Sequence, residues 1–456
     1  MLCFRSKSVV LILIFFVFAC SKDDGYTPIS INAAADTAEV FQDDTVSIPL
    51  FSNDTDLPSA ATVSFDDPQG GTITLRDPNA TPSNPFDDLL EYQSNRSFEG
   101  IDSFNYTICD SGDAANCSTA AITVTVKPRS FVNFDLQNMP LAKLSEYNFF
   151  QGNLKELTPS YKVIPYDLNS ALFSDYAKKK RFVWLPEDTE ATLVDDFSVL
   201  NFPVGSILIK NFYYQNVAGG NSTQLIETRL MYLTDNGWQF AEYVWNDEQT
   251  DAIFDDSGSF KTVEWMENGV SKTVNYRIPS KTECISCHNS QGLALPIGPK
   301  PQNLDKMVDV GQGVQNQISY LMSEGIIENT PLPAINATVD WQDDSQPMEL
   351  RVRSYLDINC AHCHSDQSFC DYRPVRFAFS ENGQAENIGI CVEPDDPILP
   401  YGDIVTPGEA DKSLLLFRLK STEEQYRMPL LGRSLQHEEG VALIEAWIDG
   451  LEQNCE

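Results

Sequence analysis

Residues 29–127 are expected to form strands, because apolar and polar side chains alternate there in short runs. The clearest runs are residues 45–50, 71–75, 104–108 and 121–126, each bounded by turn-forming residues. Period-two alternation places every second side chain on one face of a strand. Short strands with frequent turns between them predict an antiparallel β-sandwich.

A second strand-rich region follows an irregular connector and continues to residue 280. Within it, the Asn-Gly pairs at 236–237 and 268–269 each join two alternating runs. Asn and Gly accept the positive φ angles of a two-residue turn, so each pair predicts a β-hairpin. We therefore expect a central antiparallel β-domain over residues 131–280, whose last strand runs into Cys284 without an intervening helix.

The hydrophobic period changes to a helical one after residue 280. Residues 303–326 place apolar side chains about one turn apart, which predicts a helix. A second apolar stripe ends at Leu356, and a third covers residues 438–451. The C-terminal part of the chain is thus expected to be mostly α.

Two five-residue stretches, 284–288 and 360–364, share the pattern Cys-x-x-Cys-His. With 11 Cys and 4 His in 456 residues, chance placement gives an expectation on the order of 0.002 such matches. In this pattern two thiols form thioethers to a porphyrin and the adjacent imidazole binds its iron, which is the attachment signature of c-type haem. It predicts two covalently bound c-type haems, held by Cys284, Cys287 and His288 at the first motif and by Cys360, Cys363 and His364 at the second.

The second motif has the layout of a small class I cytochrome c: a helix, the motif, a long loop, a Met-Pro pair and a closing helix. His364 is the expected proximal iron ligand and Met428 the expected distal one. Such Met–His ligation raises the reduction potential and suits electron transfer. We expect His362, inside the motif, to face solvent. A core position is the alternative for Met428.

The first motif lacks an evident distal ligand. His288 is the proximal candidate, and the backbone carbonyl of Pro296 or Pro299 is expected to accept its second ring N–H. His437 is the only histidine outside the motifs and is interpreted as a surface residue. An open iron at His288 would permit peroxide or small-ligand chemistry. A four-cysteine zinc site or two vicinal disulfides would leave the histidines of both motifs unexplained.

The N-terminus resembles a bacterial lipoprotein signal. A basic start and an apolar stretch at residues 9–18 precede the lipobox-like residues 17–20. The resemblance implies that residues 1–19 are removed and that Cys20 is lipidated, with residues 20–28 as a tether. The protein would then be exported and lipid-anchored in the outer membrane or at the cell surface. An uncleaved membrane helix is the alternative.

An oxidising compartment favours disulfides among the cysteines outside the motifs. Cys109 and Cys117 are close enough to bridge a hairpin, and Cys370 and Cys391 are the second expected pair. Cys455 then remains unpaired, as a free thiol or as a sign that the second pairing is different.

The net charge of −35 repels nucleic acid and anionic membrane surfaces and is compatible with a basic redox partner protein. A well-solvated exported protein accounts for the same charge. The basic run at residues 178–181 stands out in this acidic chain. It would neutralise haem propionates, dock a partner, or form a solvated strand end.

Residues 98–106 resemble bacterial Ig-like and cadherin-like domains of exported proteins. The chain from about residue 131 onward resembles a family of exported di-haem c-type cytochromes. Besides both motifs and Met428, the resemblance is carried by residues 172–177, 202–205, 227–230 and 245–252. It implies covalent haem and electron transfer outside the cytoplasm, and it supplies no substrate.

These patterns together predict a multidomain chain: an Ig-like β-sandwich (29–127), a β-rich domain (131–280), a first haem-binding segment (281–340) and a mostly α class I cytochrome c-like domain (341–456). The expected function is that of a di-haem electron-transfer lipoprotein. A di-haem peroxidase-like enzyme with an open first iron, or a surface adhesion protein with incidental redox centres, are the alternatives.

Overall fold

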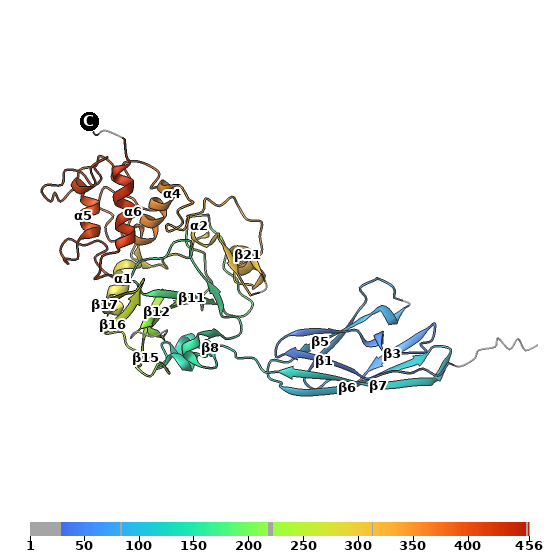
Figure 1. Cartoon of the computed structure of the whole chain (residues 1–456). Helices are drawn as coiled ribbons and strands as arrows, with labels where there is room; N and C mark the ends of the chain where they lie inside the picture. Colours follow the sequence, from blue (N-terminus) through green and yellow to red (C-terminus); the bar gives the residue numbers. More distant parts are fainter. Residues whose placement is uncertain (1–28, 83, 218–221, 312, 453–454, 456) are drawn as a thin grey trace, which may run out of the picture. The chain divides into compact units, whose positions relative to one another are not determined.

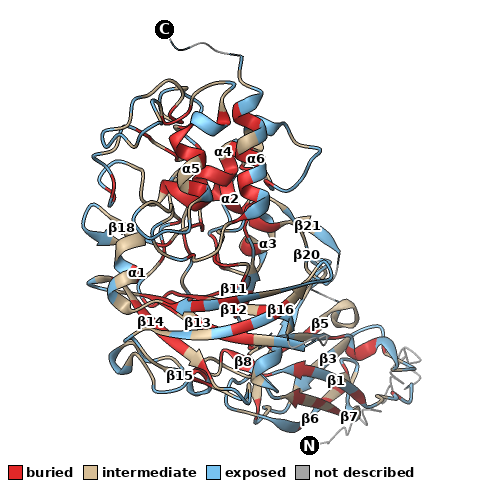
Figure 2. Ribbon diagram, turned by 60° about the vertical axis from the view of Figure 1, so that its left-hand side comes forward, coloured by how far each residue is buried: buried red, intermediate tan, exposed pale blue. Residues whose placement is uncertain are grey.

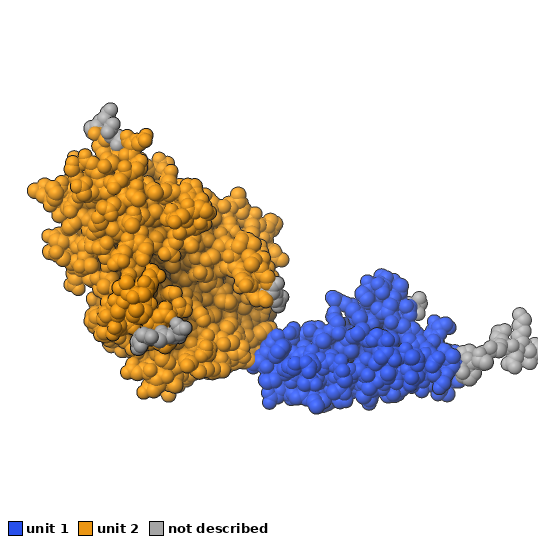
Figure 3. All heavy atoms as spheres, viewed as in Figure 1, with its two compact units in different colours: residues 1–129 blue, residues 130–456 orange. Residues whose placement is uncertain are grey.

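The computed structural model describes residues 29–82, 84–217, 222–311, 313–452 and 455. The expected signal peptide, Cys20 and the tether lie outside the described residues. The chain divides into two compact units, residues 1–129 and 130–456 (Figures 1 and 3). Among the described residues, no helix has the length and apolar character that crossing a bilayer requires.

The first unit is a β-sandwich, as predicted, but it is not fully antiparallel, because β1 pairs with β7 in the parallel direction. One sheet has the order β1-β7-β6-β3 and the other β2-β5-β4. The alternating burial along β6 explains the fold, because its inward residues Phe104, Tyr106 and Ile108 pack into the core. Its strands are β1 (Asp36–Phe41), β2 (Thr45–Ile48), β3 (Ala61–Phe65), β4 (Gly71–Arg76), β5 (Leu89–Ser94), β6 (Gly100–Asp110) and β7 (Asp113–Lys127).

The second unit is built on a sheet whose strand order is β10-β11-β12-β13-β14-β15, with β16 and β17 attached at β12. Both predicted Asn-Gly hairpins are present, as β13–β14 and β16–β17. The strands are β10 (Ile164–Tyr166), β11 (Lys178–Trp184), β12 (Ile207–Val217), β13 (Ser222–Thr234), β14 (Gly237–Trp245), β15 (Ala252–Phe254), β16 (Ser259–Glu267) and β17 (Val270–Ile278), and β8 (Phe150–Gln151) pairs with β9 (Thr158–Pro159).

The helices follow the sheet in the chain. They are α1 (Lys281–Cys287), α2 (Pro301–Leu304), α3 (Gln317–Ser323), α4 (Met348–Leu356), α5 (Leu414–Lys420) and α6 (Glu438–Asp449), and α4 continues as a π turn over Asp357–Ala361. The short hairpins β18 (Asn289–Ser290)–β19 (Leu293–Ala294) and β20 (Met307–Asp309)–β21 (Val314–Asn316) lie between them. Figure 2 shows that α4, α5 and α6 carry buried residues, which form one core around Tyr355, Leu416 and Ile444.

Three predictions about these helices are wrong. The C-terminal part of the chain is not mostly α, because residues 362–409, between the π turn and α5, form turns and loops without a helix. The expected helix over 303–326 is replaced by α2, the β20–β21 hairpin and α3, because Gly311 and Gly313 adopt positive φ angles that break a helix. A helix does lead into the first motif, since Glu283 accepts a hydrogen bond from the Ser280 backbone N–H at 2.9 Å and caps α1.

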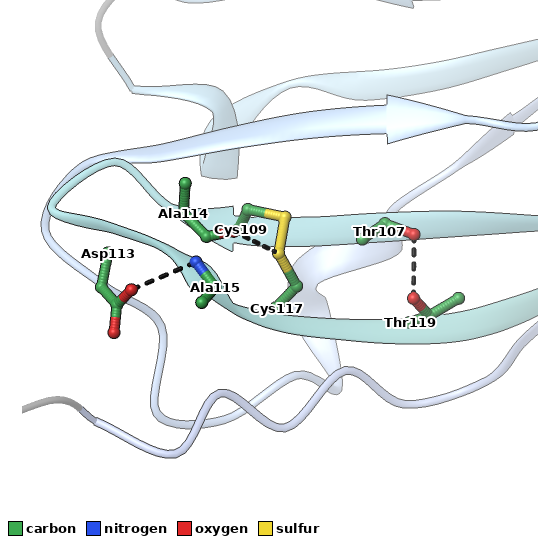
Figure 4. Close-up of a disulfide and its surroundings, with 7 residues drawn as sticks. All are labelled: Thr107, Cys109, Asp113, Ala114, Ala115, Cys117 and Thr119. Carbon is green, nitrogen blue, oxygen red and sulfur yellow. Dashed lines mark hydrogen bonds between the residues drawn. A yellow bond between two sulfur atoms is a disulfide. The ribbon is translucent and has the colours of Figure 1, made fainter.

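The disulfides are Cys109–Cys117, which joins β6 to β7 as predicted (Figure 4), and Cys391–Cys455. The expected Cys370–Cys391 pair is wrong. Cys370 is a buried free thiol in the turn after the second motif, where its backbone N–H donates to the Cys363 carbonyl at 2.9 Å. The chain end after α6 instead brings Cys455 to Cys391, with a Cα–Cα distance of 5.3 Å.

Candidate functional site

The two Cys-x-x-Cys-His motifs lie next to each other in the second unit. The ligand atoms of Cys287, His362 and Cys363 are all within 4.8 Å of one another. The Cys363 thiol donates a hydrogen bond to the Cys287 sulfur, which holds the pKa of Cys287 below its ordinary value and raises that of Cys363. The fold therefore joins two sites that are far apart in sequence, a proximity that local pattern alone did not reveal.

In the first motif, the imidazole of His288 is fixed by the backbone. Its Nδ1 is 2.8 Å from the carbonyl oxygen of Leu295, and its ring packs edge-on against Phe240 at 5.3 Å. The predicted acceptors, the carbonyls of Pro296 and Pro299, are wrong. The chain after β19 instead brings the carbonyl of Leu295, the residue before Pro296, to the imidazole. A carbonyl only accepts, so Nδ1 carries the proton and Nε2 keeps its lone pair. Burial lowers the pKa of His288 to about 3, so the ring is neutral.

The thiol of Cys284 points toward the sheet. It is buried and donates to Glu242 Oε2 at 3.5 Å. Burial and the adjacent Glu242 raise the pKa of Cys284, so this thiol stays protonated.

In the second motif, His364 follows the π turn and its backbone N–H donates to the Cys360 carbonyl at 3.0 Å. Its ring packs against Phe377 at 5.4 Å, and its buried Nδ1 has no hydrogen-bond partner among the described residues. Burial lowers the pKa of His364 to about 4, so it too is neutral. A half-buried, neutral imidazole whose buried Nδ1 is unsatisfied fits the role of a metal ligand.

A mostly apolar cavity of about 340 Å³ opens beside this histidine. Met428 lines the same cavity, so the fold brings the predicted ligand pair to one space. The buried Arg433 holds the methionine's segment, because its Nε donates to the Met428 carbonyl at 3.0 Å. Other lining residues are Cys360, Cys363, Phe369, Val375, Leu415, Leu419 and the cations Arg373 and Arg418. An apolar slot with two thiols, an imidazole, a thioether and cations for carboxylates fits a c-type haem.

Two further cavities border His288. One of about 130 Å³ lies between α1 and the sheet and is lined by Cys284, Lys210, Arg229 and Glu242. The other, of about 620 Å³, is lined by Trp238, Leu295 and His362 among others. The first motif therefore has space on more than one side of its histidine.

Sequence reasoning missed a buried charged cluster on β13 and β14. Arg229 Nη2 is 2.6 Å from Glu227 Oε1, its Nε is 2.8 Å from Glu242 Oε1, and the hydroxyl of Tyr276 donates to Glu227 at 2.6 Å. Burial raises the pKa of Glu242, while Arg229 and a hydrogen bond from Glu242 hold that of Glu227 low despite its burial. These opposite pKa directions favour a protonated Glu242 beside an ionised Glu227. The Asn236-Gly237 turn fixes the register that pairs Arg229 with Glu242. The predicted hairpin was therefore the sequence feature from which this ion pair could have been inferred.

Two predictions about the remaining histidines are wrong. His362 does not face solvent, since its Nδ1 is buried and a ring nitrogen lies within 4.8 Å of the Cys287 and Cys363 sulfurs. His437 is buried rather than exposed, because it stacks on Phe173 at 4.0 Å and its Nδ1 is 3.0 Å from the Tyr355 hydroxyl.

The basic run at 178–181 alternates along β11. Lys178 and Lys180 are exposed, whereas Arg181 is buried against Asp167 at 2.8 Å. Lys179 is half-buried and donates to the Leu172 carbonyl at 2.9 Å. Only half of the run is therefore a solvated strand surface, and the other half contributes charge to the interior.

Comparison with known proteins identifies one family. Residues 26–125 match the family described as bacterial Ig domain. No curated protein matches the chain. Among solved structures, a SusE-like surface-located polysaccharide-binding protein from the Bacteroides thetaiotaomicron heparin utilisation locus is 12% identical, with a TM-score of 0.19 over 47% of this chain and 36% of that one. An endo-fucoidan hydrolase of glycoside hydrolase family 107 is also 12% identical, with a TM-score of 0.18 over 46% and 27%.

The chain thus spans well under two thirds of those structures, and TM-scores this low support no argument about it. The Ig domain and the disulfides indicate an extracellular or surface protein. The chain is a multidomain, mostly β protein whose first unit contains a bacterial Ig-like domain.

Proposed function

We propose that the second unit is a di-haem c-type cytochrome that transfers electrons outside the cytoplasm. The observation that carries this proposal is the contact between Cys287 and Cys363. Each belongs to a complete Cys-x-x-Cys-His motif, and the contact places two haem attachment points next to each other. A pair of adjacent redox centres suits the passage of electrons from a partner to an acceptor.

The residues of the second site support distinct roles. Cys360 and Cys363 would form the thioethers, and the neutral His364 and Met428, which line the same apolar cavity, would hold the iron. When bound, the haem supplies a one-electron redox centre. The apolar lining excludes water, and Met–His ligation favours the reduced state.

At the first site, His288 would be the proximal ligand. Its Nδ1–H donation to Leu295 holds Nε2 in one orientation and makes it a better donor to a metal. No second ligand follows from the contacts of the described residues around His288. An open iron here remains the basis of the alternative proposal, a peroxidase-like enzyme.

A mononuclear metal ion is a second candidate, because Cys287, His362 and Cys363 form one soft donor cluster. This proposal leaves Cys284, Cys360 and both motif-terminal histidines outside the metal site. The haem proposal assigns a role to all of those residues, and we therefore prefer it.

We infer a lipid anchor at Cys20 in the outer membrane or at the cell surface, with a basic protein as redox partner because of the −35 net charge. Adhesion through the β-domains of residues 29–280, with incidental redox centres, is the alternative function.

Intact-mass and absorbance measurements on protein exported from a cell with a haem-attachment system test the function. The mature protein should carry two covalent haems, Cys284→Ala/Cys287→Ala should carry one, and the buried thiol variant Cys370→Ala should keep two. Protein without haem that holds one zinc ion per chain would instead support the metal-ion candidate and reject the cytochrome.

A further inference from the structure

Four charged side chains form one row across the central sheet. The strand register pairs Arg181 with Lys210, Lys210 with Arg229, and Arg229 with Glu242. Directly paired residues in antiparallel strands point to the same face. The face that carries this row is the one that Cys284 of α1 contacts through Glu242.

The partners of these cations are unequal. Arg181 is paired with Asp167, and Arg229 is paired with both glutamates of the cluster. The ammonium group of Lys210 has no hydrogen bond or ion pair with any residue that the structure describes. It lies 5.0 Å from the centre of the Phe212 ring.

Other positive charges surround the same ring. The guanidinium of Arg229 lies 4.3 Å from the Phe212 centroid and the ammonium of Lys179 lies 5.7 Å from it. Burial, together with Arg181, Lys179 and Arg229, holds the pKa of Lys210 well below its usual range. Burial and the neighbouring cations therefore disfavour the charged form of Lys210, and an anion placed beside it would stabilise that charged form.

Space for an anion exists beside Lys210. The lysine lines the cavity of about 130 Å³, together with Arg229, Tyr276 and His288. This volume accommodates a small group rather than a large substrate. We propose that the cavity beside His288 binds a carboxylate group through Lys210. The inference deepens the proposed function, since it names the ligand class of the first motif's site.

The carboxylate has two sources: a propionate of the group held at the first motif, or a small free carboxylate. Calorimetric titration of the purified holoprotein with sodium formate distinguishes them. If the natural ligand is a free carboxylate, formate should bind the wild-type protein. Lys210→Gln should then weaken formate binding by about tenfold or more, and Lys210→Arg should retain most of the wild-type affinity. Lys180→Gln, on the exposed face of the neighbouring strand, is the matched control and leaves binding unchanged.

If formate does not bind the wild-type protein, the carboxylate should be a propionate of the group held at the first motif. Lys210→Gln should then lower the reduction potential of one haem relative to Lys180→Gln, because it removes a positive charge near that centre. Absence of both effects overturns the inference. Intact mass reports separately whether haem is attached, so loss of haem would reject the proposed function, while formate titration of that protein would still test Lys210.

Discussion

His288 and His364 are held differently, although each ends a Cys-x-x-Cys-His motif. The Leu295 carbonyl accepts from His288, whereas the buried Nδ1 of His364 has no partner among the described residues. A hydrogen bond to the second ring nitrogen makes a histidine a stronger donor to ferric iron. We therefore expect the first haem to have the lower reduction potential, with the methionine at the second site increasing the difference.

Replacement of Met428 tests this asymmetry. Met428→Ala should lower the potential of one haem and leave the other unchanged, because this thioether lines the cavity of His364 and neither of the two cavities that border His288. A redox titration monitored by absorbance measures both centres, and Met322→Ala is the control. An unchanged titration would exclude Met428 as a ligand.

Carbon monoxide binding tests the open iron at the first site. The reduced wild-type protein should bind carbon monoxide at one haem, and Met428→Ala should create a second binding site. Absence of binding in the wild type would argue against the peroxidase-like alternative.

A buried carboxyl in the Ig-like unit predicts a pH dependence. Burial and the adjacent Asp54 raise the pKa of Asp36 from 3.8 to about 6. Since the folded state then binds the proton more tightly than the unfolded state, stability should fall as the pH rises from about 4 to 6 and then level off.

Asp36→Asn should remove this dependence and stabilise the first unit at pH 7 by about 1–3 kcal/mol. Chemical unfolding at several pH values measures the effect. Glu39→Gln, an exposed change on the same strand, is the control. Equal pH profiles for wild type and Asp36→Asn would contradict the expectation.

At the scale of elements, the crossing of α4 and α6 depends on one glycine. A Cβ at Gly440 would lie 2.4 Å from the hydroxyl oxygen of the buried Tyr355, whose neighbour in the core is Trp341. The same tyrosine hydroxyl contacts His437 at the start of α6. This packing explains why a residue interpreted from the sequence as exposed is buried.

Gly440→Ala should therefore destabilise the second unit by about 1–3 kcal/mol through overpacking. Thermal unfolding measured by circular dichroism tests it. Gly402→Ala is the matched control, because a Cβ there meets no atom within 4 Å. Equal melting temperatures for the two variants would show that α4 and α6 adjust without cost.

At the scale of the whole molecule, the residues proposed for redox function all lie in the second unit. That unit contains its own sheet, its own helical core and the Cys391–Cys455 disulfide. The first unit has a separate core and its own disulfide. We therefore predict that the second unit keeps the proposed redox function when the chain is divided near residue 129.

Separate expression of the two units tests this division. Residues 130–456, exported with a foreign signal, should bind two haems with the potentials of the full chain. Absorbance and redox titration check this, and residues 29–129 alone should fold without haem. Loss of haem attachment in residues 130–456 would show that the Ig-like unit takes part in forming the site.

Local sequence pattern was enough to predict strands β2, β4, β6 and β7 of the Ig-like unit, both Asn-Gly hairpins, the helix ending at Leu356 and the closing helix, whereas β1, β3 and β5 were not predicted. The predicted features depend on local periodicity and turn chemistry. The two motifs could be found in the sequence because the proposed haem attachment would require a fixed local spacing, and Met428 was a ligand candidate because a Met-Pro pair precedes the closing helix. Only the tertiary structure placed Cys287 beside Cys363, paired Cys391 with Cys455 and buried His437.

The charged row through Lys210 and Arg229 is also a feature that could not be predicted from local pattern. Its members are distant in sequence and meet only through strand register, and their burial depends on what covers the sheet. Local pattern specifies which side chains share a face, whereas the packing of distant segments decides which charges are neutralised and which face a cavity.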